Sequence, residues 1–202
     1  MIANEKQAQQ VVISYMGGFA WPTVLLLATC VGVYGACVWH LVTDPHFSWW
    51  VVAGIAFCAY AAYTPVHEAV HGAITGMSIT LRWVNEWAGF IAAHLLGVSF
   101  IAHRRGHLNH HRATNHPEDD PDMPFSAKSL PAVIAMWFKG IPKEWIFAVT
   151  FKHFTAAEKR TVVLEYVAIF VTRALLLIYC ADLGVTLVTL ALGYIIGNAV
   201  LT

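Results

Sequence analysis

The sequence predicts an all-α integral membrane protein with about four transmembrane helices, interfacial helices and a histidine-rich helical cap on the cytoplasmic side. Of its 202 residues, 58% are hydrophobic and only 12% are charged, about half the charged share of an average soluble domain. The apolar residues form blocks long enough to cross a bilayer, which takes about 20 residues of helix. Too little polar surface remains to coat a soluble globule, so we expect residues 1–202 to form a single membrane domain.

Four apolar blocks are the predicted transmembrane helices. They run over residues 19–42, 49–66, 162–181 and 184–202, and Thr43-Asp44-Pro45 separates the first two. The first block is longer than the apolar region of a cleaved signal peptide, which has about 7–15 residues. We therefore expect it to be retained as a span.

Polar side chains interrupt two of the apolar regions. Residues 81–102 carry charged and amide side chains, so we predict a helix that lies in the interface or re-enters the membrane rather than a clean span. Arg173 lies in the middle of a predicted span, where a charge needs a partner or must reach the interface. Glu165, eight residues earlier, is one candidate partner, and snorkelling is the other option.

The placement of the basic residues predicts the orientation. Nine of the 12 Lys and Arg residues lie within residues 104–160, whereas the loops 43–48 and 182–184 contain none. Because loops rich in Lys and Arg stay in the cytoplasm, we expect the N-terminus and residues 67–160 to face the cytoplasm. The inner membrane of a bacterium is the expected location.

Charge and cysteine usage argue against two other kinds of site. The formal net charge is +0 at pH 7, so nothing indicates a nucleic-acid partner. The four cysteines lie in apolar blocks and none forms a CxxC pair, which argues against a disulfide framework or a thiolate metal site. We expect them to be small apolar side chains of the spans.

Two groups among the eleven histidines have helical spacing. His67 and His71 are four residues apart, and His107, His110 and His111 follow an i, i+3, i+4 pattern. Residues at these spacings share one helix face, with about 5–6 Å between their Cβ atoms. Neutral imidazole binds iron, zinc and copper. Both groups lie at the ends of apolar helices on the same side of the membrane. We therefore predict that they bind metal at one shared site.

The first group alone leaves two chemistries open. Residues 67–71, HEAVH, match the HExxH pattern of zinc metalloproteases, in which Glu68 would act as the general base. This is the alternative from another reaction class. It lacks a further acidic ligand in an NPxPxxDG-like segment and leaves the second histidine group without a role.

The second group carries a more specific pattern. Residues 103–122, HRRGHLNHHRATNHPEDDPD, resemble the second histidine box of the membrane fatty acid desaturase superfamily, with its basic residue, HxxHH, Thr and closing DPD. HEAVHG resembles the first box. The order of spans and boxes also matches that family. The resemblance covers the chain after about residue 15, with a partial desaturase domain at approximately 45–202.

The resemblance implies a non-haem di-iron centre with two Fe ions and O2 as co-substrate. His67, His71, His107, His110 and His111 would be the iron ligands, with no catalytic residue beyond them. Glu68 would orient an imidazole, and His103 is the first candidate for an additional ligand. The implied partners are a membrane lipid substrate and an electron donor of the ferredoxin or cytochrome b5 type.

The resemblance leaves the reaction open between two oxidations. Desaturation of a long acyl chain is the leading interpretation, and hydroxylation or ketolation of a carotenoid ring is the alternative, because residues 115–122 also resemble bacterial carotenoid hydroxylases and ketolases. The third histidine box of the superfamily does not occur before Thr202. We therefore expect the chain to be a fragment, or a truncated product that binds iron incompletely and has no turnover.

Overall fold

The computed structural model describes residues 18–201 except 77, 117, 123–128, 137, 139 and 152. Within these residues the fold is all-α, with no strand. The elements in chain order are α2 (Trp21–Thr43), α3 (Trp49–Ala61), α4 (Tyr63–Val70), the short 3-10 helix η1 (Ala73–Thr75), α5 (Arg82–Leu96), α6 (Phe100–Ala113), α7 (Leu130–Met136), α8 (Gly140–Thr150), α9 (Ala156–Tyr179) and α10 (Leu183–Leu201).

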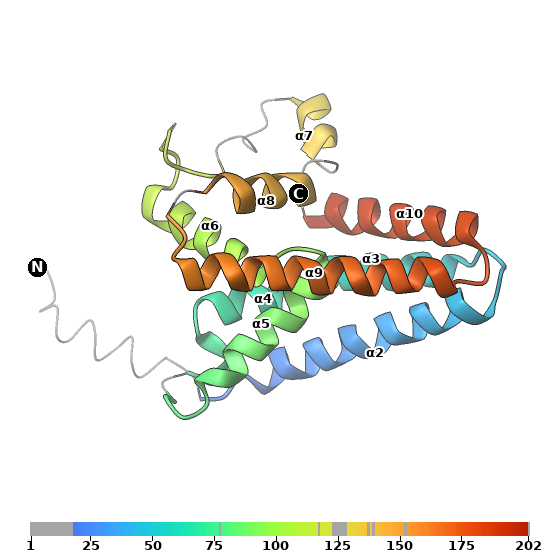
Figure 1. Cartoon of the computed structure of the whole chain (residues 1–202), viewed down its shortest axis with the longest axis horizontal. Coiled ribbons are helices and arrows are strands. Elements are labelled where there is room, and N and C mark those ends of the chain that lie inside the picture. The colour runs from blue at the N-terminus through green and yellow to red at the C-terminus, as the bar shows by residue number, and fades with distance from the viewer. Residues whose placement is uncertain are drawn as a thin grey trace, which may run out of the picture.

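Four segments of the described chain are long and apolar enough to cross a membrane. They are α2, the consecutive helices α3 and α4 together, α9 and α10. In Figure 1, α3, α9 and α10 run along one direction, and α2 slants across the lower side of the bundle. Large apolar side chains point out of this bundle, for example Leu25, which is 69% exposed, and Ile178, which is 70% exposed. These side chains suit contact with lipid, so the predicted four-span membrane fold is confirmed.

Helix α10 packs against α3 through two glycines. A Cβ atom on Gly193 would lie 2.5 Å from the Ile55 side chain, and one on Gly197 would lie 2.6 Å from the Cβ atom of Ala59. Four residues separate the glycines, which places both on the same face of α10. Small residues at such positions let two membrane helices approach closely.

Helix α9 begins at Ala156, earlier than the predicted start at residue 162. The reason is a capping box: the Thr155 hydroxyl accepts from the Glu158 amide, and the Glu158 carboxylate accepts from the Thr155 amide. Arg105 of α6 also binds Glu158. The first turn of α9 is therefore polar and capped. A prediction that follows only the apolar residues starts the helix after this turn.

The region predicted as one interfacial or re-entrant helix is a bent pair. Helices α5 and α6 meet at an angle of 97°. Gly97 ends α5 with φ +78°, a conformation that L side chains rarely adopt. Ser99 then starts α6, because its hydroxyl accepts from the Ala102 amide at 3.1 Å.

Two charged residues of α9 hold this bend from its two sides, and Arg173 does not pair with Glu165. The Arg173 guanidinium donates to the carbonyl of His94 at 2.8 Å, in the last turn of α5. The Glu165 carboxylate accepts from the Ser99 hydroxyl and from the Ile101 amide at the start of α6. A cation at a helix C-terminus and an anion at an N-terminus both match the helix dipole. The charges inside the span thus fix the position of α6.

Candidate metal centre

Four histidine side chains converge where α4 and α6 meet. His67 lies in the last turn of α4 and His71 directly follows it, whereas His107 and His111 belong to α6. One ring nitrogen of each lies within 4.8 Å of the other three. The Nε2 atom of His107 is 3.1 Å from that of His71 and 3.0 Å from that of His111. We call these four residues the four-histidine cluster.

Local backbone geometry explains this convergence. Helix α4 ends at Val70, and Gly72 follows in the left-handed region with φ 68°, which turns the chain away after His71. His107 and His111 are one turn apart on α6, so their rings share a face. Because α5 and α6 meet at a sharp bend, this face of α6 returns to the end of α4.

The surroundings of His71 and His107 favour the neutral form of both imidazoles. Burial, and after it the neighbouring imidazoles, lower the pKa of His107 to about 3. Burial and the proximity of His111 also lower the pKa of His71. A neutral imidazole offers a lone pair, which is the form that binds a metal ion. Four such nitrogens fit iron, zinc or copper.

The structure does not bring His110 into the four-histidine cluster. Its Nδ1 atom instead lies 2.8 Å from the Asp120 carboxylate and 3.4 Å from that of Asp122. These three residues form a second group of potential metal ligands. Of the five predicted histidine ligands, four therefore lie in the four-histidine cluster, and His110 lies in the second group.

Asp120 is the centre of this second group. Its side chain is only 2% exposed, and it accepts from the amides of Asn115 and Asp122 as well as from His110. Burial by itself would raise the pKa of Asp120, but the hydrogen bonds from His110 and the two amides lower it to about 2. Asp120 is thus an ionised carboxylate that binds the imidazole of His110. Asp122 in turn pairs with Lys143 of α8.

The other two candidate residues, Glu68 and His103, each contact a side chain that the sequence did not indicate. Glu68, expected to orient an imidazole, accepts a hydrogen bond from the Thr23 hydroxyl of α2. His103 is buried, and its Nδ1 atom lies 3.4 Å from the carboxylate of Glu144 in α8. Glu144 was not identified from the sequence, because nothing in its local pattern distinguishes it from other charged residues of residues 103–160.

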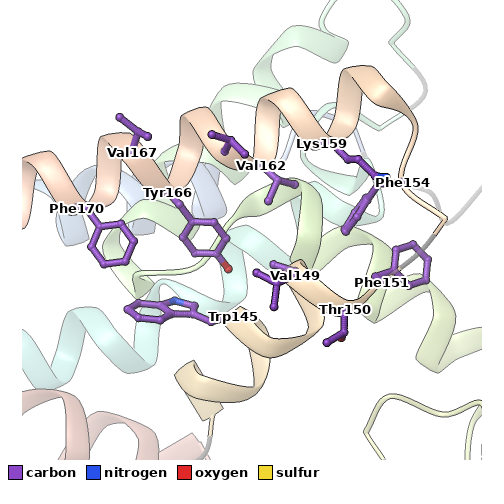
Figure 2. Close-up of a pocket in the computed structure, with 12 residues that line it drawn as sticks. Trp145, Val149, Thr150, Phe151, Phe154, Lys159, Val162, Tyr166, Val167 and Phe170 are labelled. Atoms are coloured by element: carbon purple, nitrogen blue, oxygen red, sulfur yellow. The ribbon is translucent and has the colours of Figure 1, made fainter.

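An apolar groove lies between α8 and α9, with a volume of about 790 Å³. Figure 2 shows Trp145 and Val149 of α8 facing Val162 and Tyr166 of α9 across it. The groove borders α6, since Ala102 of that helix packs in one apolar cluster with Val162. Its shape and lining suit a hydrocarbon chain.

Comparison with known proteins identifies a matching family and two relatives. A sequence model of the family described as fatty acid desaturase matches residues 46–202. A zeaxanthin 4-ketolase from Chlamydomonas reinhardtii is 31% identical over 136 residues, which is 62% of this chain and 29% of that protein. A human sphingolipid delta(4)-desaturase is 26% identical over 138 residues, which is 66% of this chain and 36% of that protein.

The chain spans about a third of the length of these two relatives. No solved structure matches it. The family match includes both histidine groups, and it gives no support to the metalloprotease alternative that HExxH left open.

Proposed function

We propose that this chain, which belongs to the fatty acid desaturase family, is a membrane-bound, O2-dependent oxidoreductase acting on a lipid of the same membrane. The observation that carries the proposal is the four-histidine cluster, because α4 and α6 bring it together from two separate histidine boxes. Two of these imidazoles are half-buried and two are exposed, but their ring nitrogens face one another within 4.8 Å, and a metal ion is the partner that holds several imidazole nitrogens at such close range.

The residues present fit iron. His67, His71, His107 and His111 would hold one ion, and His110 would offer its remaining nitrogen toward the second. Iron, when bound there, would supply the activation of O2 that oxidation of an unactivated C–H bond requires.

The chain itself supplies position and protonation state. Asp120 holds the proton of His110 on Nδ1, which leaves the Nε2 lone pair available to a metal. Glu165 and Arg173 keep α6 at its angle to α5, so His107 and His111 stay opposite the end of α4. Such rigid support keeps a metal site within the narrow geometry that it needs.

The leading substrate is a long acyl chain, which the reaction would desaturate. The sphingolipid desaturase among the relatives and the groove between α8 and α9 support it. Carotenoid ring oxidation is the second candidate, because the relative with 31% identity is a zeaxanthin ketolase.

The expected orientation places the centre on the cytoplasmic side, where a soluble electron donor has access. The nine basic residues within residues 104–160 support this orientation. A carrier of the ferredoxin or cytochrome b5 type would deliver the electrons. The inner membrane of a bacterium stays our proposed location.

Expression of the chain in bacteria that also make carotenoids tests the proposal. We expect bound iron in the purified protein, and new acyl double bonds in the lipid extract if the chain turns over without the third histidine box of the superfamily. Oxidised carotenoids without acyl change would support the second candidate. His107→Ala should abolish both iron binding and product, whereas His46→Ala, at the opposite end of the bundle, should change neither. Zinc without iron would contradict the proposed function, whereas iron without any oxidised lipid is the outcome expected of a chain that has two of the three histidine boxes.

A further inference from the structure

His103 has one ring nitrogen in contact with a carboxylate and the other without any partner. The residue is 8% exposed, and its Nδ1 atom lies 3.4 Å from Oε1 of Glu144. Its Nε2 atom is buried and has no hydrogen-bond partner among the described residues. A buried polar atom without a partner loses its hydration and gains nothing in return, so this nitrogen needs an explanation.

The carboxylate decides which nitrogen carries the proton. A proton on Nδ1 faces Glu144, which leaves a lone pair on Nε2. Histidines that bind metal ions almost always donate their other N–H to a carboxylate, a carbonyl or water. His110 with Asp120 has the same arrangement in this protein. His40 also has a carboxylate near Nδ1, that of Asp44 at 3.9 Å, and a buried Nε2 atom without a partner among the described residues. Its neighbouring ring is that of Trp50, however, whereas His103 lies next to His107.

The position of His103 places it beside the four-histidine cluster. It lies one helical turn before His107 on the same face of α6, and the two rings stack with centroids 5.8 Å apart and planes 19° apart. The ring of Tyr63, in α4, makes a T-shaped contact with His103, with centroids 6.1 Å apart. The ring of His103 therefore lies next to Tyr63 of α4 and His107 of α6, the two helices that carry the cluster.

Helix α8 supports both carboxylate-bound histidines through adjacent residues. Glu144 contacts His103, and Lys143 pairs with Asp122, which lies 3.4 Å from Nδ1 of His110. Helix α8, which belongs to neither histidine box, thus contacts His103 directly and is connected to His110 through Asp122.

We propose that His103 is an additional metal ligand of the centre, binding through Nε2, and that Glu144 is its positioning residue. This rests on the proposed function, since it assumes that the four-histidine cluster binds metal. The centre then has six histidines in the described chain rather than the five that the histidine boxes give.

Metal binding by the purified full chain tests the proposal, with Co²⁺ as a spectroscopic probe and Fe²⁺ for stoichiometry. His103→Gln keeps an amide that can donate to Glu144 but removes the imidazole, and His103→Ala removes both. We expect each to weaken Co²⁺ binding at least about tenfold and to change its visible absorption spectrum. Glu144→Gln should weaken binding by about 10–100-fold while the spectrum keeps its shape, because all ligands remain. His46→Ala is the matched control and should bind as the parent chain does.

The outcomes separate this inference from the proposed function. If the parent chain binds neither Co²⁺ nor Fe²⁺, both fail. If the parent chain binds metal and the two His103 variants bind it with the same affinity and spectrum, only the inference fails. A lower melting temperature of the metal-free variants with unchanged metal binding would assign His103 a structural role and would also overturn the inference.

Discussion

Replacing Gly197 with alanine tests the contact between α3 and α10. The added Cβ atom would lie 2.6 Å from the Cβ atom of Ala59 and 2.8 Å from the carbonyl oxygen of Ala56. Carbon atoms in optimal contact are about 3.5–4.0 Å apart. Helix α10 must therefore move away from α3 by roughly 1 Å, because a backbone carbonyl cannot rotate aside as a flexible side chain can.

The size of the effect follows from this displacement. Forcing an extra carbon into a packed contact costs about 1–3 kcal/mol. For a chain of this length, each 1 kcal/mol lowers the melting temperature by about 2–4 °C. We therefore expect Gly197→Ala to lower the melting temperature in detergent by roughly 2–12 °C, although alanine is the better helix former.

Thermal unfolding of the purified protein, followed by circular dichroism, measures the shift. Gly32→Ala in α2 is the matched control, because nothing lies within 4 Å of the position of its Cβ atom. That variant should keep or slightly raise the melting temperature, since alanine favours the helix by about 1 kcal/mol. Equal melting temperatures for the two variants would refute the close helix contact.

Three further predictions concern the metal centre and its support. Asp120→Asn removes the charge next to His110 and should weaken metal binding about tenfold, as titration with Co²⁺ would show; unchanged affinity would argue against a positioning role. Arg173→Met removes the guanidinium donor from the His94 carbonyl, which keeps only the Gly97 amide, and should lower the melting temperature; an unchanged melting temperature would show that the α5 end does not need the guanidinium. Glu165→Ala removes the acceptor at the start of α6 and should reduce metal affinity as well as stability, so a loss of stability alone would contradict the link between the bend and the centre.

The sequence predicted the spans well because a bilayer imposes a length and an apolar composition on each. The boundary of α9 was less accurate, since Thr155 and Glu158 form a polar cap that hydropathy cannot include. The bend between α5 and α6 was predicted only as a choice between interfacial and re-entrant, and Gly97 supplies its geometry.

The candidate centre was predicted in part. Helical periodicity correctly predicted that His67 lies near His71 and His107 near His111, because each pair consists of neighbours along one stretch of chain. It could not show that His110 contacts Asp120 rather than the cluster, since the turn after α6 determines that contact. Glu144 and His103 meet through the packing of α8 on α6, and no local pattern reports such a contact.

The two charged residues of α9 have a consequence for how the protein responds to its membrane. Glu165 and Arg173 attach one transmembrane helix to both sides of the α5–α6 bend. A helix adjusts its tilt and depth to the thickness of the bilayer. We therefore expect an adjustment of α9 to pull on the helix that carries His107 and His111, so that the spacing of the imidazoles responds to the thickness of the membrane.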